Sequence, residues 1–500
     1  MTKKHSTLLI LLVIHLFLFS CKEEKTDYSV QFDQKNIVND HFEGFGVQWS
    51  TYIHADAPRD PWGYLMKDPK RWQFLFQKLD YMQPSIIRIL DNSQDRYFRR
   101  LDNNGIPVLS FDRHEMHALY RVLDYCQREN ITVILGEWNP SWQFNQNNYD
   151  QWVEMIGQFL HHLIKKKKYT CIKYYTIVDA PNTFKAKTQG DWEHWKEIIE
   201  MLHQQLNKKE LNQYVKIMGP SSDPQWSMPN KDTEGKEWLG KTQKELHEKI
   251  GAYDIHAILT EQSILNDRVD SALNISSESI QQLAHPLFIT EYALQQSDSV
   301  IHDGRTSRNS QSAVYTTKYA INTTVGSIQL LNDGADAIVA WNLDDAMFTE
   351  ASDGNKSQLI RWGMFNSLGD TLYQDSTELN NRPWYYTWSW MSKYIPKGSR
   401  IIKMDNKNHH NFYAVGAITL NNEYVTLMVN LAETSKAISV EFQDDISELD
   451  FYCFEMNAHQ VFDQHSVILS RNTDIKVMNH RNLYVKMSPF EVKLITTEQK

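Results

Sequence analysis

The segment Lys173–Asn182, with the sequence KYYTIVDAPN, decides how the rest of the chain is interpreted. An aromatic and β-branched run ends abruptly in a polar tetrapeptide, Asp179–Asn182, that contains a proline. This pattern is typical of a buried strand whose last residues leave the sheet and face solvent. The tetrapeptide is therefore expected at the end of a strand, where it is accessible to a ligand.

Seven other apolar segments have the same character and alternate with helical patterns. They are residues 42–49, 85–91, 131–138, 215–220, 253–257, 286–292 and 337–342, and the helical patterns include 114–128, 151–166 and 192–206. Alternating strands and helices indicate stacked βα units. Eight such strands predict an α/β protein with a (β/α)8 TIM barrel, whose active site lies at the C-terminal ends of the strands.

The pattern changes after a helix expected near 383–394. Short alternating strands follow, such as 411–420, 424–431, 437–442 and 484–495, and predict a C-terminal β-sandwich domain. The 500 residues suit a barrel plus a second domain. The expected division is 1–20 signal peptide, 21–40 tether with N-terminal strands that could join the sandwich, 41–397 barrel and 398–500 sandwich.

The first twenty residues have the pattern of a targeting segment. Lys3 and Lys4 precede an apolar run over residues 8–19, which is too short to span a bilayer comfortably. The end of this run, with Cys21, resembles a bacterial lipobox, and residues 22–25 are similar to surface-export signals of Bacteroidetes lipoproteins. The resemblance implies that Cys21 is lipidated and anchors the protein at the outer membrane or cell surface. Without lipidation the protein would be secreted or periplasmic.

Composition narrows the classes of partner. The formal net charge of −10 and the lack of a long basic block beyond residues 165–168 argue against nucleic-acid binding. Fifteen Trp residues suit either a large core or a sugar-binding cleft, because aromatic rings stack on the apolar faces of sugars. The remaining cysteines, Cys126, Cys171 and Cys453, are widely spaced and show no metal-ligand clustering. No metal or organic cofactor is expected.

The tetrapeptide Asp-Ala-Pro-Asn resembles the Asn-Glu-Pro-Asn that ends the fourth barrel strand of retaining glycoside hydrolases of clan A. The likeness is closest to families 39 and 30 and to family 5-like proteins, and it implies a glycosidase with a carbohydrate substrate. The family's catalytic acid/base Glu falls on Ala180, which can neither donate nor accept a proton. Its first Asn, which binds the sugar 2-hydroxyl, falls on Asp179, which can accept a hydrogen bond but has no amide proton to donate.

Glu291 is the predicted nucleophile. The apolar run over residues 288–292 places this carboxylate at the end of the seventh strand, as in the family's nucleophile motif. Arg88 matches an Arg beside the nucleophile, where a cation would keep Glu291 ionised. His256 matches a family His or Tyr near the nucleophile. A structural ion pair for Arg88 and a core position for His256 are the alternatives.

Seven residues are candidates for binding sugar or for replacing the missing acid/base. Trp341 is similar to the Trp that floors the first sugar subsite, Trp138 follows the third strand, and Asn182 matches the last Asn of the tetrapeptide. Glu137 is the leading candidate for a relocated acid/base, and Asp179 is the second. Asp344 and Asp345 are a third option, for which loop hydrogen bonding is the favoured interpretation.

Two functions follow from these residues. The first is a glycoside hydrolase that uses Glu291 with a non-standard acid/base. The second is a catalytically impaired surface lipoprotein that binds a glycan in the old cleft. The Asp179-Ala180 pair favours the second, whereas Glu291, Arg88, His256 and Trp341 favour the first.

Overall fold

The computed structural model describes residues 26–50, 68–138, 141, 143–295, 310–347, 360–404, 411–458 and 475–497. The strands are β1 (Tyr28–Phe32), β2 (Ile37–Asn39), β3 (Gly44–Gln48), β4 (Ile86–Asp91), β5 (Phe98–Leu101), β6 (Pro107–Leu109), β7 (Thr132–Glu137), β8 (Ile172–Thr176), β9 (Lys216–Ile217), β10 (Tyr253–Thr260), β11 (Leu287–Gln295), β12 (Ala337–Ala340), β13 (Arg400–Lys403), β14 (Phe412–Ile418), β15 (Tyr424–Asn430), β16 (Lys436–Phe442), β17 (Tyr452–Asn457), β18 (Ile475–Met478), β19 (Asn482–Met487) and β20 (Glu491–Thr496). The helices of eight or more residues are α3 (Pro69–Met82), α5 (His114–Arg128), α6 (Tyr149–His161), α7 (Trp192–Lys208), α8 (Trp238–Leu246), α12 (Thr317–Asp333) and α14 (Pro383–Tyr394). The short α-helices are α4 (Ser93–Arg96), α9 (Glu261–Leu265), α10 (Val269–Leu273), α11 (Ser277–Gln281) and α13 (Gly369–Tyr373).

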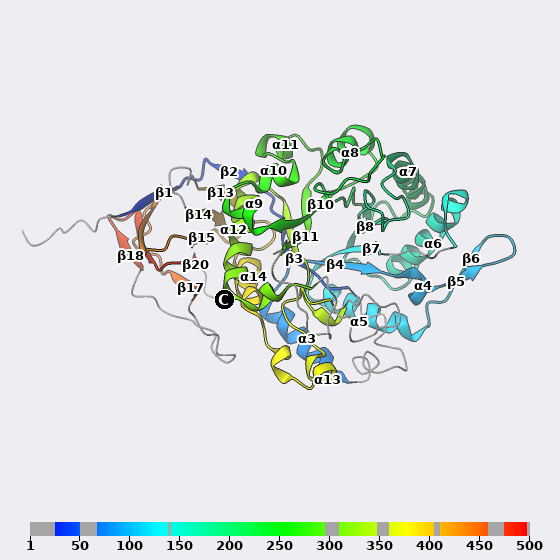
Figure 1. Ribbon diagram of the computed structural model, residues 1–500, viewed down its shortest axis with the longest axis horizontal. Coiled ribbons are helices and arrows are strands. Elements are labelled where there is room, and N and C mark those ends of the chain that lie inside the picture. The colour runs from blue at the N-terminus through cyan, green and yellow to red at the C-terminus, as the bar shows by residue number, and fades with distance from the viewer. Residues whose placement is uncertain are drawn as a thin grey trace, which may run out of the picture.

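Eight parallel strands form the central barrel (Figure 1). Their order in the sheet is β10-β11-β12-β3-β4-β7-β8-β9. The parallel bridges Met218–Ala252 and Ser222–Ile255 join the β9 region to β10 and close the sheet on itself. The predicted TIM barrel and its eight strands are confirmed.

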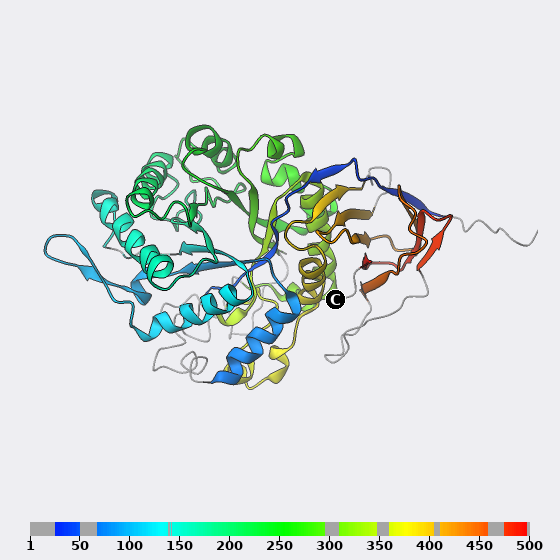
Figure 2. The same cartoon turned by 180° about the vertical axis from the view of Figure 1, so that it is seen from behind.

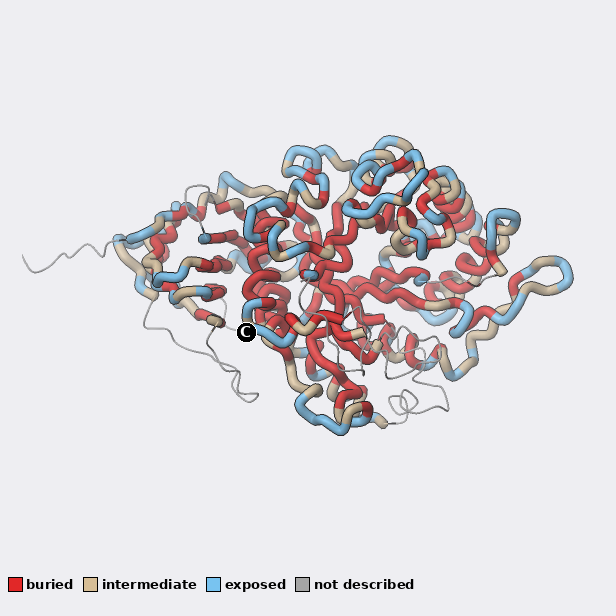
Figure 3. The backbone as a smooth tube through the Cα atoms, in the orientation of Figure 1, coloured by how far each residue is buried: buried red, intermediate tan, exposed pale blue. Residues whose placement is uncertain are grey.

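Alternate residues of the strands face opposite layers of the core. Residues such as Ile86, Ile134 and Phe288 form a compact cluster inside the barrel. Their neighbours Ile87 and Val133 belong to the large cluster between the strands and the outer helices. Strands buried on both faces account for the nearly continuous apolar runs in the sequence, and Figure 3 shows them as a buried centre wrapped by partly exposed helices.

Two antiparallel-rich sheets lie beside the barrel. One has the order β1-β16-β19-β18 and the other β17-β20-β15-β14-β13-β2. A second apolar cluster, including Phe412, Ile438 and Val485, draws residues from both sheets. This is the architecture of a β-sandwich, and it lies at one end of the molecule in both Figure 1 and Figure 2.

The N-terminal segment crosses from the sandwich to the barrel. Strand β1 pairs in parallel with β16, β2 pairs with β13, and the chain then enters β3 of the barrel. Figure 2 shows this path as a blue strand that runs along the sandwich. The signal peptide and Cys21 lie outside the described residues. Within the described residues, no helix is long and apolar enough to cross a membrane.

Some local features depart from the sequence-based expectation. The strand expected over 215–220 has only two ladder residues in β9, and Met218 beyond it forms an isolated bridge to Ala252. Strands β5 and β6 pair as an antiparallel hairpin in a loop region that the sequence left unassigned. Cys126, Cys171 and Cys453 are buried.

Candidate active site

Arg88 is the centre of a buried charge cluster at the C-terminal ends of the strands. It lies on β4 with the same alternation as Ile86, so its side chain points into the barrel. Its Nη1 donates to Glu291 Oε1 at 2.8 Å, and its Nη2 donates to Asp179 Oδ1 at 2.5 Å. The guanidinium is completely buried. A buried cation is stable only when it is paired and hydrogen-bonded, and here two carboxylates share it.

Glu291 faces the barrel interior because β11 contains a bulge. The pairing with β10 runs His256–Thr290 and then Ile258–Ala293, so β11 has one extra residue at this point. Glu291 itself has φ +50°, a left-handed conformation that non-glycine residues seldom adopt. An extra residue in a strand re-aims the side chain there. The next side chain, Tyr292, then points outward, and its hydroxyl donates to Thr323 O on α12.

His256 connects the two carboxylates. Its Nδ1 lies 3.3 Å from Glu291 Oε2, and its Nε2 lies 3.5 Å from Asp179 Oδ1. The ring is buried, as are Arg88 and Glu291. The structure therefore brings together four predicted residues: Arg88, Asp179, His256 and Glu291.

The charges in this cluster shift one another's pKa values. Burial lowers the pKa of His256, but Glu291 and Asp179 outweigh burial and raise it to about 9. Burial raises the pKa of Asp179, yet Arg88 and His256 together bring it below its ordinary value. Burial raises the pKa of Glu291, and His256 and Arg88 offset this only in part. Two neighbouring carboxyls whose pKa values are pushed apart are typical of catalytic sites.

Two polar residues complete the cluster and were not predicted. Gln48 on β3 accepts from Arg88 Nη1 at 2.9 Å. Ser221, after β9, accepts from Arg88 Nη2 at 3.1 Å, and its Oγ lies 3.2 Å from His256 Nε2. Both follow apolar strand segments, so the strand-end rule that selected Arg88 could have found them.

The loop after β8 places Asp179 in the cluster but uses Asn182 differently. Asn182 Nδ2 donates to the carbonyls of Asp223 and Trp226 at 2.7 and 2.8 Å, and its Oδ1 accepts from Asp223 N at 3.1 Å. The side chain is buried and joins the loops after β8 and β9. Asn182 therefore supports the site instead of facing a sugar. Ala180, with φ +44°, is held by a hydrogen bond from its N–H to Ser221 O.

Glu137 does not lie in the cluster. It follows Val133 and Leu135 on the outer face of β7, and its Oε1 accepts from Ser93 N at 2.9 Å. Burial raises its pKa to about 8, and the backbone of Ser93 opposes this only in part. The expectation that Glu137 lines the same cleft as Glu291 is therefore corrected, because strand alternation directs its side chain to the helix layer.

Trp341 and Trp138 form an aromatic platform near the strand ends. Their rings are stacked with centroids 5.8 Å apart. Trp341 is largely buried beside Ala293 and Trp362, whereas Trp138 is 41% exposed. An exposed ring that extends a buried one suits stacking against a sugar.

Asp344 and Asp345 serve the loop after β12. Asp344 accepts from the backbone of Ala346 and Ser367, and Asp345 pairs with Arg382 at 2.5 Å. Their carboxylates are buried in these contacts. This geometry agrees with the favoured interpretation, in which both residues form hydrogen bonds within the loop.

The cluster is less suited to a metal ion than its ligand types suggest. One ligand atom from each of Asp179, His256 and Glu291 lies within 4.8 Å of the others. Arg88 already bonds both carboxylates, however, and His256 carries a pKa of about 9 that favours its protonated form. A histidine that ligates a metal must be neutral, so the two carboxylates are better suited to the cations already beside them, Arg88 and protonated His256.

Comparison with solved structures identifies the fold. The chain resembles a GH30 endoxylanase from Clostridium papyrosolvens C71, with 12% identity, TM-score 0.61 and coverage of 94% of this chain and 98% of that one. It resembles a GH39 enzyme from Xanthomonas axonopodis pv. citri, with 11% identity, TM-score 0.61 and coverage of 96% and 99%. An endo-β1,6-glucanase matches at 14% identity and TM-score 0.61 over 95% of both chains. No family model and no curated protein sequence matches. The fold is that of clan A glycoside hydrolases.

Proposed function

We propose that the protein is a glycoside hydrolase in which Glu291 is the nucleophile. The observation that carries this proposal is the buried set of Arg88, Glu291, His256 and Asp179 at the ends of the barrel strands. A left-handed, bulged residue and shared buried charges are costly features, which cluster at functional sites. The likeness of the fold to xylan- and glucan-cleaving enzymes supports a carbohydrate substrate.

The proposed first step is displacement at the anomeric carbon. A Glu291 oxygen forms a bond to that carbon, and the bond between the carbon and the leaving oxygen breaks. Arg88 and His256 hold the carboxylate in place by the contacts described above. Water then attacks the anomeric carbon of the glycosyl-enzyme and loses one proton to solvent. The bond to Glu291 breaks, which releases the sugar and restores the carboxylate.

The leaving oxygen departs without a proton from position 180. Ala180 has no ionisable group, Glu137 points to the helix layer, and Asp179 is kept ionised by Arg88 and His256. Asp179 and Glu291 approach within 4.8 Å, which is too close for the water of an inverting pair. General acid help is worth about 10²–10⁴-fold, so substrates with good leaving groups should be strongly preferred.

Dinitrophenyl β-xyloside and β-glucoside test this proposal directly. The parent protein should cleave them far better than the corresponding disaccharides. Glu291→Gln should reduce the rate by about 10³-fold or more. Glu137→Gln is the matched control, since it changes a buried carboxyl on the other face of the barrel wall, and it should retain the rate. Equal rates for the parent and Glu291→Gln would reject Glu291 as the nucleophile.

Ala180→Glu provides the complementary test. If the rest of the site is competent, this change should raise activity on natural glycosides. Azide should accelerate turnover of the parent on dinitrophenyl substrates, because a small anion can attack the glycosyl-enzyme without a general base. The same azide effect should shrink in Ala180→Glu.

A catalytically impaired glycan-binding protein is the second candidate. Ala180 favours this candidate, because the residue at the position of the family's acid/base has no proton to give. Binding of a xylan or glucan oligosaccharide, with no turnover by the parent, with azide or by Ala180→Glu, would support this candidate over the hydrolase.

We also propose that Cys21 carries a lipid and anchors the protein at the outer membrane or cell surface. The lipobox-like end of the apolar N-terminal run supports this. Cys21→Ser should block processing or release the protein from the membrane fraction. A variant that matures and fractionates like the parent would contradict lipidation.

A further inference from the structure

Two exposed aromatic side chains lie together at the end of the barrel that holds the Arg88 cluster. Phe184 is 57% exposed in the loop after β8, and Trp226 is 43% exposed in the loop after β9. Their ring centroids are 6.1 Å apart, and the ring planes make an angle of 55°. Among the residues that the structure describes, Trp226 and Trp138 are the exposed Trp side chains, and both follow C-terminal ends of barrel strands.

The loops that carry this pair also supply the charge cluster. Phe184 comes five residues after Asp179, and Trp226 comes five residues after Ser221. Asp179 and Ser221 both bind the guanidinium of Arg88. Because five residues span at most about 18 Å when fully extended, the aromatic pair is continuous with the site.

Backbone contacts hold the two rings in place. Asn182 Nδ2 donates to Trp226 O at 2.8 Å and so ties the loop after β8 to the loop after β9. A turn in which Thr183 N–H donates to Ala180 O at 3.0 Å directly precedes Phe184. Rings that are positioned before binding lose less conformational entropy when a ligand stacks on them. Since these contacts use backbone oxygens, the two rings can be replaced without removing them.

The exposed area of the pair suits a sugar better than a protein. Phe and Trp side chains present about 150–250 Å² each, so the exposed parts of the two come to roughly 200 Å². A specific protein interface takes about 800 Å² from each partner, which is far more than these rings provide. One or two sugar rings match the available surface.

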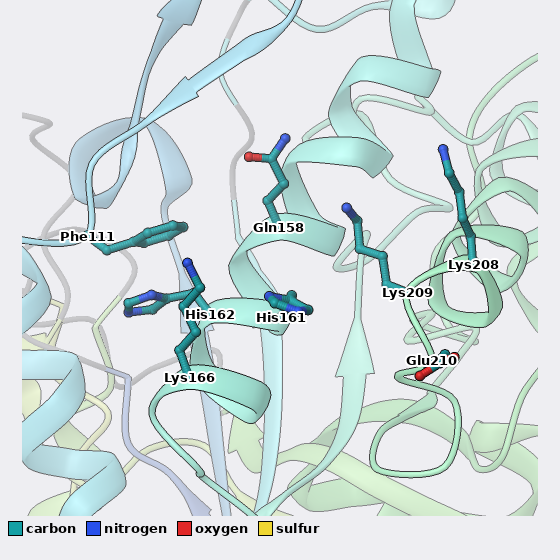
Figure 4. Close-up of a pocket in the computed structure, with 8 residues that line it drawn as sticks. All are labelled: Phe111, Gln158, His161, His162, Lys166, Lys208, Lys209 and Glu210. Atoms are coloured by element: carbon teal, nitrogen blue, oxygen red, sulfur yellow. The ribbon is translucent and has the colours of Figure 1, made fainter.

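The pocket in Figure 4 provides a contrast at the opposite end of the barrel. It has a volume of about 360 Å³ and lies where α6 and α7 end, before β8 and β9 begin. The Phe111 ring in its lining stacks against His162, with centroids 4.1 Å apart. That ring is therefore already covered by a neighbouring ring, whereas Phe184 and Trp226 are open to solvent beside the cluster.

We propose that Phe184 and Trp226 form a sugar-binding platform for a neutral oligosaccharide, distinct from the platform of Trp341 and Trp138. The apolar faces of sugars stack on such rings. In the proposed hydrolase the acid/base position faces the leaving group, and here that position is Ala180, at the start of the turn that leads to Phe184. The platform is therefore assigned to the leaving-group side of the scissile bond. This side assignment rests on the proposed hydrolase, whereas sugar binding at the pair does not.

Calorimetry with the full chain tests the platform without turnover. The Glu291→Gln background keeps the probes intact, and the probes are xylotetraose and a β1,6-linked glucotetraose. Phe184→Leu/Trp226→Leu should weaken tetrasaccharide binding by about tenfold or more, whereas Phe184→Tyr/Trp226→Tyr should retain it. Tyr214→Leu/Phe490→Leu removes two exposed rings outside these loops and should have little effect. Because stacking does not require charge, binding should change little with added salt.

Turnover of glycosyl fluorides tests the side of the scissile bond. With Glu291 intact, β-xylosyl fluoride and β-glucosyl fluoride offer a good leaving group and no leaving-group sugar. Their kcat/KM should therefore be the same in the parent and in Phe184→Leu/Trp226→Leu. A tenfold loss in the double variant would show that the rings contact the reacting sugar, and would overturn the side assignment.

Other results would overturn the platform itself. These are no tetrasaccharide binding to the Glu291→Gln chain, or equal binding after the change of both rings to Leu. Self-association that the Leu variant abolishes, with no sugar binding, would assign the pair to a second copy of the chain. If no variant turns over the fluorides but the Leu variant still loses tetrasaccharide binding, the hydrolase fails and the platform stands.

Discussion

At the residue scale, the site depends on the sharing of one guanidinium by two carboxylates. Arg88 contacts Asp179 and Glu291 at 2.5 and 2.8 Å, and His256 lies against both. These contacts favour ionised Asp179 and protonated His256. In the proposed hydrolase, the acid/base position of the family falls on Ala180, which does not titrate. The ionisation of the site should therefore differ from that of an enzyme with two catalytic carboxyls.

The pH profile of dinitrophenyl glycoside cleavage should show this difference. Glu291 must be ionised to attack, and its raised pKa places the acid limb above the ordinary value of 4.5. The alkaline limb should lie near pH 9, where His256 loses its proton and the two carboxylates are left with one cation. The measurement is kcat/KM from pH 4 to 10.

Two variants check the assignment of these limbs. With a natural glycoside as substrate, Ala180→Glu should show an alkaline limb below pH 9, because departure of a poor leaving group then requires a protonated carboxyl. His256→Gln should abolish the limb near pH 9. An unchanged profile in His256→Gln would show that another group sets it.

Glu137 should affect stability instead of catalysis. Its pKa is raised to about 8 by burial, so the folded protein holds a proton that the unfolded chain releases near pH 4.5. The unfolded state then binds fewer protons, and the free energy of unfolding falls as pH rises from about 4.5 to 8. Glu137→Gln should remove this loss and gain about 1–4 kcal/mol relative to the parent by pH 8.5.

Denaturant unfolding at pH 5 and pH 8.5 measures this effect. The difference between Glu137→Gln and the parent should grow toward the higher pH. If it is the same at both values, Glu137 is not held protonated by burial.

At the element scale, the strands could be predicted from sequence, but the direction of their last side chains could not. The eight apolar runs predicted the barrel, because strands that are buried on both faces are apolar along nearly their whole length. Glu137 and Glu291 both end such runs, and their sequence context looks equivalent. Strict alternation from Phe288 and Thr290 would direct Glu291 outward, and the bulge in β11 reverses this. A one-residue irregularity of this kind depends on pairing with β10 and β12, which the local sequence does not specify.

The directions of the loop side chains could not be predicted from the sequence either. Asp179 and Asn182 belong to one tetrapeptide, yet the first reaches Arg88 and the second binds the backbone of the loop after β9. Their roles depend on contacts with segments far away in sequence. Gln48 and Ser221 follow apolar strand segments but have no distinctive motif, and only the position of Arg88 shows what they do.

Close packing between barrel strands predicts opposite effects for two glycines. A Cβ on Gly46 of β3 would lie 2.6 Å from Ile86 O and 2.7 Å from Ile86 Cβ on β4. Gly46→Ala should therefore lower stability by about 1–3 kcal/mol, as overpacking does. Gly240 of α8 has nothing within 4 Å of its Cβ position, and Gly240→Ala should raise stability by about 0.5–1 kcal/mol. Chemical denaturation of both variants against the parent is the measurement, and a similar change in both would contradict the packing argument.

At the scale of the whole molecule, the N-terminal segment joins the two parts of the structure. Strand β1 is held at five positions along β16, and β2 lies at the edge of the other sandwich sheet. Asn39 of β2 donates to the backbone of Gly334 and Ala335 at the end of α12, next to the barrel. The sandwich is therefore completed by residues that precede the barrel in sequence.

Removal of this segment should uncouple the sandwich from the barrel. A chain that begins at His41 lacks β1 and β2 and loses the buried side chains of Val30 and Phe32, each about 1% exposed. Burial of such side chains is worth about 1.5–3 kcal/mol each, so the loss should be about 3–6 kcal/mol, concentrated in the sandwich. Calorimetry should show an early unfolding transition that is absent from a control chain beginning at Thr26. The buried Arg88 cluster lies in the barrel, so cleavage of dinitrophenyl glycosides should persist until the second transition. A single transition at the control temperature would mean that the barrel and sandwich do not depend on β1 and β2.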